Sequence, residues 1–464
     1  MFDNLKEKIL GSTMDIKMEK KLVAENDAVN RYSLEVISVS DSAYICSMGA
    51  RICYGLKVDE SYAKNRAHIA RIVGMGHDSV SAHSNVIALI GVKGDCTEDL
   101  MQIMPAVKYM NIVKLSKTIK ADAEDGEDTV ENYLLVSGSV RAFRYFFTTY
   151  DYYNDTVSPL ARFFLRIASE NFEKEFFENI LKDTKLFANR LDQFEYLAPL
   201  MIDVKEVKNP ETGEIEEIAD ISDDSGTMHY EPICSDRVNI VYADYIIGVI
   251  VELVTKFPDI DKDTLIKAAF DTCIVTTVLH DYSRAISQQI NRHQSGISQE
   301  SQRYVDYSKS QFVDPLQFDA ERYDIDNVYN VSIDGKDIDG TSAEIGTKLQ
   351  SVYHQLKEQG MLAQDARSFL PFNVKTKSMH TWTLTNFLHF IAVRTGKAAQ
   401  PEVRLIAKEM VKNYKLALDR MVDEIDPEYA ELALDICNRI KDYIDSISSK
   451  DKMVIYYNNE KVEV

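Results

Sequence analysis

The alternation of apolar and polar residues predicts several strands. Residues 33–40 (YSLEVISV) alternate and include β-branched side chains, a pattern typical of a strand. The apolar runs at 83–92 (HSNVIALIGV) and 273–279 (CIVTTVL) predict buried strands. The short run MVIYY at 453–457 predicts one more strand near the end of the chain.

The spacing of apolar residues also predicts helices. In residues 281–293, Ala285, Ile286 and Ile290 share one face of a helix. Residues 400–421 are amphipathic, with Pro401 at an early helical position where a missing N–H is tolerated. Further helices are expected at 41–55, 60–75, 383–394 and 427–446.

The stretch from about 97 to 265 interrupts this regular pattern. It contains an acidic segment at 120–128 and a polar one at 204–226, in which NPETG predicts a turn between two short strands. Aromatic-rich helices are expected at 140–153 and 170–187. We interpret the whole stretch as an insertion with a small core of its own.

Composition and charge narrow the class of protein. The chain has 464 residues, 45% of them hydrophobic, which favours two domains or one domain with a large insertion and excludes global disorder. Acidic residues outnumber basic ones by 74 to 53, for a net charge of -21, which argues against a nucleic-acid-binding or membrane-binding surface. A local cluster of arginines in so acidic a chain therefore indicates a specific anionic ligand.

The cysteines and the absence of targeting signals indicate the cellular compartment. The six cysteines form neither a CxxC pair nor a cysteine–histidine ladder, which fits a reducing compartment and argues against a zinc ribbon. The N-terminal residues lack an apolar signal core, and no run of 18 apolar residues occurs, so we expect a cytoplasmic protein. The GxGxxG, GxxxxGKS/T, GxSxG and HExxH motifs are also absent.

The polar segment at 291–307 (NRHQSGISQESQRYVDY) is the first candidate for chemistry. Guanidinium groups bind phosphate oxygens through paired hydrogen bonds, hydroxyls can complete such a cradle, and Gly296 allows close approach of a ligand. The alternative is an exposed loop paired with surface carboxylates, but the density of donors after a predicted strand and helix favours ligand binding. The donors are Arg292, His293, Ser295, Ser298, Ser301 and Arg303.

Two other places carry candidate residues. The segment GMGHDSVSAH brings His77, Ser79 and His83 next to a predicted strand. Two histidines without a third ligand make a metal site the less favoured interpretation, and helix caps or turn hydrogen bonds are the alternative. Arg367 and Arg394 come from apolar surroundings. For Arg394 taken alone, a cation stabilised by a helix C-terminus is the simpler account.

Four segments, in this order, resemble the flavin-dependent (alternative) thymidylate synthases. HDSVSAH (77–83) is similar to that family's H-D/E-S-P-x-E-H segment. RHQSGISQESQRY (292–304) is similar to its central signature, which reads Arg-His-Arg, seven variable residues and Ser, usually continued as x-Arg-Tyr. ARSFLP (366–371) and VRTGKAAQPEVR (393–404) are similar to its two later blocks. The resemblance covers roughly residues 33–95 and 270–420.

The resemblance implies an α+β fold, with a twisted, mostly antiparallel or mixed sheet flanked by helices and, here, a largely helical insertion. It divides the chain into an N-terminal part of the synthase-like domain, the insertion, a C-terminal part that contains the signature, and a C-terminal helix and tail. The four parts are residues 1–96, 97–265, 266–421 and 422–464.

The resemblance also implies an enzyme that methylates dUMP to dTMP with FAD, NADPH and methylenetetrahydrofolate, as a homotetramer whose active sites draw on more than one subunit. No metal, nucleic acid or membrane is expected, and the Pro-Cys dipeptide of the cysteine-dependent thymidylate synthases is absent. The flavin would be bound by His77, Ser79, Arg292, His293 and Thr383. The nucleotide dUMP would be bound by Gln289, Gln299, Ser301, Gln302, Arg303, Arg367 and Arg394. Three of these residues, His293, Ser301 and Arg394, would take part in catalysis.

The chain also departs from the family pattern. Gln294 replaces the third signature residue, and six residues rather than seven separate it from Ser301. Loss of a charge-assisted contact there would cost about 1.5–3 kcal/mol of ligand binding. These departures leave two alternatives open, a relative that modifies C5 of the pyrimidine differently, for example by hydroxymethylation of dUMP, and a nucleotide-binding scaffold without catalysis. The other departures are Val80, Ala82, Thr383 and Ala398.

Overall fold

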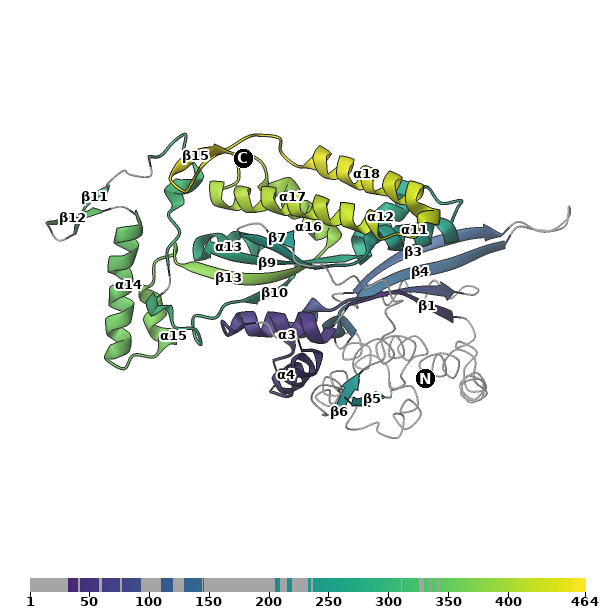
Figure 1. The fold of residues 1–464 in the computed structure, drawn as a ribbon, viewed down its shortest axis with the longest axis horizontal. Coiled ribbons are helices and arrows are strands. Elements are labelled where there is room, and N and C mark those ends of the chain that lie inside the picture. Colours follow the sequence, from purple (N-terminus) through teal and green to yellow (C-terminus); the bar gives the residue numbers. More distant parts are fainter. Residues whose placement is uncertain are drawn as a thin grey trace. The chain divides into compact units, whose positions relative to one another are not determined.

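The computed structural model divides the chain into two compact units. It describes residues 32–40, 42–57, 61–75, 77–92, 110–119, 129–143, 145, 205–208, 215–218, 233–234, 237–309, 311–324, 329–333, 335–340 and 342–464. The first unit consists of Met1–Met48, Asp59–His229 and Asp244–Ile274. The second consists of Gly49–Val58, Tyr230–Ala243 and Val275–Val464. Figure 1 gives the elements of both units.

The first unit is built on a four-stranded antiparallel sheet. Its strand order is β1-β2-β4-β3, with β2 pairing along its whole length with β4. Val86 to Ile90 of β2 are all buried, which confirms the buried strand predicted from the apolar run at 83–92. The strands are β1 (Tyr32–Val39), β2 (Val86–Val92), β3 (Met110–Ile119) and β4 (Thr129–Gly138).

Two helices of the first unit begin at clear capping residues. Ser61 accepts a hydrogen bond from the Lys64 N–H at 3.4 Å at the start of α4, and Asp261 accepts one from the Thr264 N–H at 3.1 Å at the start of α12. Helix α12, which the sequence pattern did not predict, packs against β3 and β4. The helices are α4 (Tyr62–Gly74), α11 (Ile246–Lys256), α12 (Lys262–Thr272) and the first part of α3 (Ser42–Cys53), which continues into the second unit.

The segment predicted as an insertion contributes to this first sheet. β3 and β4 both lie between residues 97 and 265 and complete the sheet begun by β1 and β2, so these two strands share a sheet with residues 32–92. The predicted pair of short strands is confirmed by β5 (Lys205–Lys208) and β6 (Ile215–Ile218), which are antiparallel. The turn at 209–213, the acidic segment at 120–128 and the predicted helix at 170–187 lie outside the described residues, as does most of the one at 140–153.

The second unit is built on a five-stranded sheet. Its order is β10-β13-β9-β8-β7, and the pairs β10–β13, β9–β8 and β8–β7 are antiparallel. Together with the first sheet and the flanking helices, this confirms the predicted α+β class. The strands are β7 (Ile233–Cys234), β8 (Val238–Ala243), β9 (Ile274–Ser283), β10 (Gly296–Gln299) and β13 (Lys375–Thr383).

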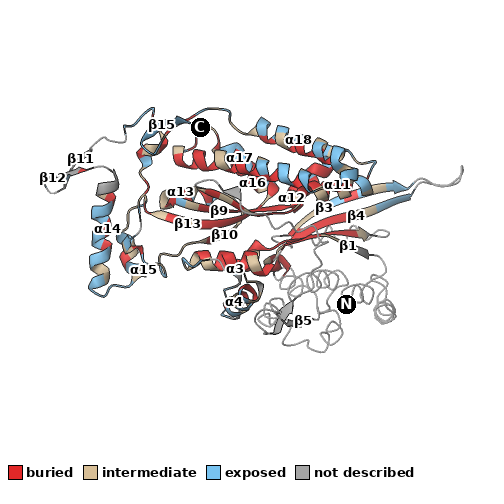
Figure 2. Cartoon of the chain, viewed as in Figure 1, coloured by how far each residue is buried: buried red, intermediate tan, exposed pale blue. Residues whose placement is uncertain are grey.

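Amphipathic helices cover this sheet. α17 packs against β8 and α16 against β13, while α18 packs on α17 (Figure 1). The first turns of α17 are buried on all sides, from Glu402 to Ala407, and from Ala407 to Met421 the buried residues recur at the spacing of a helix with one buried face. Helix α18 has an exposed outer side (Figure 2). These helices are α13 (Arg284–Ile290), α16 (Leu384–Arg394), α17 (Pro401–Asp423) and α18 (Ala430–Ile447).

Smaller elements complete the second unit. Helix α14 (Ser342–Glu358) leads into α15 (Ala363–Ala366) and the 3-10 turn η8 (Arg367–Phe369). Two hairpins are formed by β11 (Tyr329–Ile333) with β12 (Lys336–Gly340), and by β14 (Val454–Tyr457) with β15 (Glu460–Glu463). The second hairpin confirms the strand predicted from MVIYY.

The predicted helix at 281–293 is shorter than expected. Strand β9 continues to Ser283, and helix α13 spans only Arg284–Ile290. Ser283 stays extended because its hydroxyl accepts a hydrogen bond from the Ile286 N–H at 3.3 Å and so caps the helix. Among the helices that the structure describes, none is both long enough and apolar enough to cross a bilayer.

Candidate functional site

The turn between α13 and β10 carries the first part of the candidate site. The Asn291 N–H donates to the Ser287 carbonyl at 2.9 Å, and the His293 N–H donates to the Ile290 carbonyl at 3.0 Å. These bonds close the end of the helix and turn the chain towards β10. Arg292 is exposed and His293 is half-buried, so the turn presents one cation and one imidazole ring at its surface.

His293 contacts Arg394, the last residue of α16. The Arg394 Nε–H donates to His293 Nε2 at 3.2 Å, so Nε2 carries no proton and the neutral ring is protonated on Nδ1. Phe390 packs edge-on against the His293 ring, with 5.0 Å between centroids. Burial lowers the pKa of His293 to about 4, with contributions from the charges of Arg394 and His389. At neutral pH the pair is therefore a neutral imidazole and a guanidinium.

Gln299 is the last residue of β10, and both the nitrogen and the oxygen of its side-chain amide are hydrogen-bonded. Its Nε2–H donates to the Tyr282 hydroxyl at 3.3 Å, and its Oε1 accepts from Asn291 Nδ2 at 3.5 Å. Gln289, on α13, donates from Nε2 to Oε1 of Gln400 at 2.7 Å, which ties the helix to the start of α17. These two of the three predicted nucleotide-binding glutamines are half-buried and oriented by neighbouring side chains.

The turn that follows Gln299 presents Ser301, Gln302 and Arg303. The Ser301 N–H donates to the Cys53 carbonyl at 2.9 Å, and its Oγ accepts from the Arg303 N–H at 3.2 Å. Arg303 is exposed, with its guanidinium carbon 5.4 Å from the centroid of the Tyr304 ring. Ser298, by contrast, is buried, so it does not contribute to the surface of this turn.

Partly buried polar contacts hold the turn on its inner side. Arg284 Nη1 donates to the Glu300 carbonyl at 3.1 Å and to Thr376 Oγ1 at 3.3 Å. The Tyr307 hydroxyl donates to Glu300 Oε1 at 2.5 Å. Burial and the Glu300 carboxylate raise the pKa of Tyr307 far above its ordinary value, so its proton stays on the phenol.

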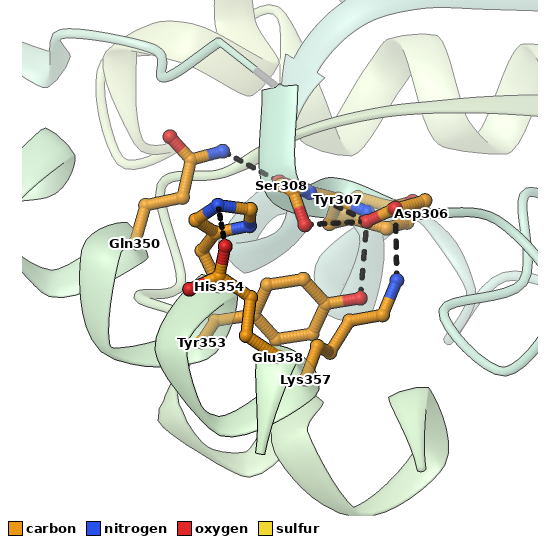
Figure 3. Close-up of polar contacts among 8 residues, drawn as sticks. All are labelled: Asp306, Tyr307, Ser308, Gln350, Tyr353, His354, Lys357 and Glu358. Carbon is orange, nitrogen blue, oxygen red and sulfur yellow. Dashed lines mark hydrogen bonds and ion pairs between the residues drawn. The ribbon is translucent and has the colours of Figure 1, made fainter. Parts of the chain in front are cut away.

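Helix α14 holds the same segment from another side (Figure 3). Gln350 Nε2 donates to the Tyr307 carbonyl at 2.5 Å, and the Tyr307 N–H donates to the Tyr353 hydroxyl at 3.4 Å. Lys357 Nζ lies 2.8 Å from Asp306 Oδ2. Although burial alone would raise it, hydrogen bonds from Lys357 and Ser308 lower the pKa of Asp306 to about 2. Residues 306–308 are thus fixed to one face of the helix.

The remaining predicted residues have other surroundings. Arg367 is half-buried in η8, and its Nε–H donates to the Gln364 carbonyl at 3.0 Å. The Thr383 hydroxyl caps α16 by accepting from the Asn386 N–H at 3.3 Å. His77 and Ser79 belong to the first unit, where both are exposed, and His77 makes no capping bond to the 3-10 helix η2 (Asp78–His83). The structure therefore gathers His293 and Arg394, and separately Gln299 to Arg303, within the second unit.

His83 has a structural environment. Burial and the charge of Arg141 lower the pKa of its fully buried ring to about 4. Among the residues that the structure describes, no group of three or more histidine, cysteine, aspartate or glutamate side chains could hold a metal ion.

Sequence reasoning missed several residues that hold the site together. Glu402 accepts bonds from the Ser283 N–H and hydroxyl, both at 2.6 Å, and so links α17 to the start of α13. Arg404 donates to the carbonyls of Thr395, Asp451 and Lys452. The sequence does contain a signal for these two residues. A glutamate and an arginine on the apolar side of a predicted amphipathic helix need buried hydrogen-bond partners.

Comparisons with known proteins match the part of the chain that carries most of these residues. Residues 266–418 match the family described as "Thymidylate synthase complementing protein". This range contains all the predicted site residues except His77 and Ser79.

Curated relatives carry the name flavin-dependent thymidylate synthase. The protein from Synechocystis sp. is 31% identical over 132 residues, which are 27% of this chain and 59% of that protein. The one from Geobacter sulfurreducens is 31% identical over 139 residues, 29% of this chain and 53% of that protein. A probable flavin-dependent thymidylate synthase of Paramecium bursaria Chlorella virus 1 is 27% identical over 135 residues, 29% of this chain and 62% of that protein.

The match is partial on both sides, since the chain spans between 53% and 62% of the length of these three relatives. It nevertheless contains the whole signature and the Arg394 block. Residues 266–418 of this chain are therefore similar to the flavin-dependent thymidylate synthases.

Proposed function

We propose that the protein methylates dUMP to dTMP, with FAD as its flavin, NADPH as reductant and methylenetetrahydrofolate as carbon donor. The observation that carries the proposal is the hydrogen bond between Arg394 and a neutral His293 at one end of β10, with Gln299 to Arg303 at the other end. At one end, an oriented guanidinium is available to polarise the uracil ring. At the other end, hydrogen-bond donors are available for the nucleotide phosphate.

Arg394 is suited to polarise the uracil ring. C5 of uracil is a weak nucleophile, and a guanidinium beside the ring carbonyls stabilises the negative charge that develops when C5 attacks. His293 accepts from Nε, which leaves the two terminal nitrogens of Arg394 to face a ligand. Because His293 is neutral, it orients Arg394 without adding a second positive charge.

The segment from Ser301 to Arg303 is suited to bind the nucleotide phosphate. Arg303 is exposed, and the Tyr304 ring beside it limits the directions that its guanidinium can take. The Ser301 hydroxyl accepts from the Arg303 N–H and keeps its own proton for a ligand oxygen. The half-buried Gln299, fixed by Tyr282 and Asn291, would contact the nucleoside, and Gln289, Gln302 and Arg367 would add further contacts.

The turn at Arg292 and His293 fits a flavin. An exposed guanidinium beside a half-buried imidazole, which packs on Phe390, offers both a cation for phosphate and a flat surface for a ring system. His77, Ser79 and Thr383 would complete this set, and the Thr383 hydroxyl proton remains available after its cap bond. When bound, the flavin supplies the hydride that completes the methyl group.

The proposal includes a homotetramer and no nucleic-acid or membrane partner. Large apolar side chains near η8 are well exposed in the single chain, namely Leu362 (63%), Phe369 (51%) and Phe372 (66%). Light scattering on the purified protein would give a mass of about four times 52.9 kDa if the proposal is correct.

The test of the activity has three steps. The purified protein should show a flavin absorbance band, and NADPH oxidation should accelerate when dUMP and methylenetetrahydrofolate are added. Mass analysis should then find a nucleotide heavier by one methyl group. A colourless protein that cannot be loaded with FAD would instead favour a scaffold.

A second candidate has a specific observation in its favour. Gln294 follows His293 in the turn before β10, and the signature segment from Gln294 to Ser301, which contains β10, is one residue short. If this protein transfers the carbon unit in a different way, we expect the difference to originate at Gln294 and the shortened segment. A nucleotide product heavier by a hydroxymethyl group would identify a pyrimidine hydroxymethylase.

A further inference from the structure

A line of hydrogen-bonded polar side chains crosses the sheet of the second unit. Gln299 on β10 lies opposite Ser378 on β13, and Ile297 lies opposite His380, so Ser378 and His380 point to the same face of β13. Tyr282, Ser378 and His380 are all fully buried. The line runs from Gln299 Nε2 to the Tyr282 hydroxyl at 3.3 Å, to Ser378 Oγ at 2.7 Å and to His380 Nε2 at 2.8 Å.

The contacts along this line order its protons in one direction. Gln299 donates from Nε2, since its Oε1 accepts from Asn291, and Tyr282 then gives its single proton to Ser378. Ser378 must pass on its own proton, because a buried hydroxyl without an acceptor is costly, and His380 Nε2 lies within reach. His380 is therefore the neutral tautomer with its proton on Nδ1.

The line ends at Ser295, in the turn that also carries His293. His380 Nδ1 lies 3.4 Å from Ser295 Oγ, so the Nδ1–H donates to this hydroxyl. The His380 ring is held by stacking on Trp382, with 5.2 Å between centroids and 21° between planes. Trp382 in turn packs on Phe390, and Phe390 on His293. Ser295 and His293 are thus positioned by one connected set of rings.

We propose that Ser295 is a ligand-contacting residue whose hydroxyl donates to a carbonyl or phosphate oxygen of the bound nucleotide or flavin. Its oxygen accepts from His380, so its proton points away from the buried line and towards the half-buried surface of the signature turn. Tyr282, Ser378 and His380 are positioning residues that fix the direction of this donor. The choice of ligands rests on the proposed function.

The tautomer of His380 is tested on the ligand-free full-length protein. The chain has only nine histidines, so magic-angle-spinning NMR of protein labelled with ¹⁵N-histidine can resolve them, and His380→Phe identifies the His380 signals by their loss. We expect a protonated Nδ1 and a bare Nε2. A proton on Nε2, or on both nitrogens, would overturn the proposed direction of the line.

The role of Ser295 is tested by a double-mutant cycle. Ser295→Ala should weaken either dUMP binding or FAD retention by about three- to tenfold, the usual range for one neutral hydrogen bond, and the ligand that is weakened identifies the acceptor. Ser378→Ala should weaken the same ligand, and the double variant should bind no worse than Ser295→Ala. Additive losses, or unchanged binding of both ligands in Ser295→Ala, would refute the proposal.

A matched control separates this effect from a loss of stability. Thr276→Val also removes a buried hydroxyl from the same sheet, one that hydrogen-bonds Thr381 at 2.8 Å outside the line. It should lower the melting temperature about as much as Ser378→Ala and leave ligand binding unchanged. If the wild-type protein binds neither dUMP nor FAD, the proposed function and the ligand contact of Ser295 both fail, whereas wild-type binding with an unaffected Ser295→Ala refutes this inference alone.

Discussion

At the scale of single residues, the contact between His293 and Arg394 decides the chemistry. The two residues are 101 positions apart, and each alone has an ordinary structural explanation. Together they form a neutral acceptor that holds a guanidinium in one orientation. This orientation, rather than the charge alone, distinguishes Arg394 from a cation that only stabilises a helix end.

We therefore expect Arg394→Lys to lower kcat/KM for dUMP by roughly 10- to 100-fold, although the charge is kept. Lysine is a point charge without the planar fork, and the loss of one oriented donor to a developing anion is typically of this size or larger. Steady-state kinetics with varied dUMP measures the change. Arg439→Lys, on the exposed face of α18, is the control and should behave as wild type. Equal activity of both variants would contradict the role of Arg394.

His293 should also make stability depend on pH. Its pKa is about 4 in the folded protein and about 6.5 when unfolded, so the unfolded chain binds a proton first as the pH falls. Stability is therefore lost as the pH drops from about 6.5 towards 4. His83 and His280, whose pKa values are also lowered to about 4, act in the same direction. His293→Gln should reduce the difference in urea midpoint between pH 7 and pH 5, and an unchanged or larger difference would count against this account.

The resemblance to known motifs identified most candidate residues but not what holds them. The line through Tyr282, Ser378 and His380 was not predicted. In KTKSMHTWT only Met379 and Trp382 are apolar, so the segment lacks the apolar pattern by which a buried strand is predicted. Ser378 and His380 can be buried because Ser378 accepts from Tyr282 on the neighbouring strand β9, and His380 bonds with Ser378 on its own strand. Such pairing depends on register, which a single sequence does not reveal.

At the scale of elements, helix α14 acts as a brace for the segment that follows the signature. Its contacts differ in burial, since Gln350 is buried whereas the Lys357 and Asp306 side chains of the ion pair are 25% and 60% exposed. An exposed ion pair contributes about 0–1 kcal/mol to stability, while an unsatisfied buried carbonyl costs about 1–3 kcal/mol. The hydrogen bond to the Tyr307 carbonyl should therefore dominate the attachment.

Gln350→Leu should accordingly loosen residues 301–308 more than Lys357→Met does. The leucine keeps the volume but leaves the Tyr307 carbonyl without its donor. We expect faster hydrogen exchange of these amides and several-fold weaker dUMP binding, measured by mass spectrometry and calorimetry. Leu349→Ala, on the exposed side of the same helix, is the control. A larger effect from Lys357→Met would show that the ion pair, and not the buried amide, holds the segment.

Hydrophobic periodicity predicts the ends of some helices well and of others poorly. The long helices α16, α17 and α18 were predicted to within a few residues, because each has a continuous apolar face. The start of α13 was placed too early, since Ser283 extends β9 and caps the helix with its side chain. Capping depends on a single hydroxyl, which hydrophobic periodicity does not register.

At the scale of the whole molecule, the two units differ in how firmly they are linked to the flavin-dependent synthases. The family match covers residues 266–418, whereas residues 32–92 resemble the family mainly through HDSVSAH. A flavin-binding role for His77 therefore depends on one short motif. It is the assignment for which a direct test is most informative.

His77→Ala should lower the FAD content of the purified protein severalfold without changing its thermal stability. The ring is exposed and makes no capping bond, so its removal should alter the free energy of unfolding by no more than about 0.5 kcal/mol. His354→Ala is the matched control, because this exposed histidine pairs only with Glu358 among the contacts drawn in Figure 3 and lies far along the sequence from the motif. Normal FAD content in His77→Ala would remove His77 from the proposed flavin-binding residues and leave Ser79 as the one proposed from the first unit. A loss that accompanies unfolding would instead mean that the motif stabilises the first unit, because an exposed ligand-binding residue affects the cofactor and not the fold.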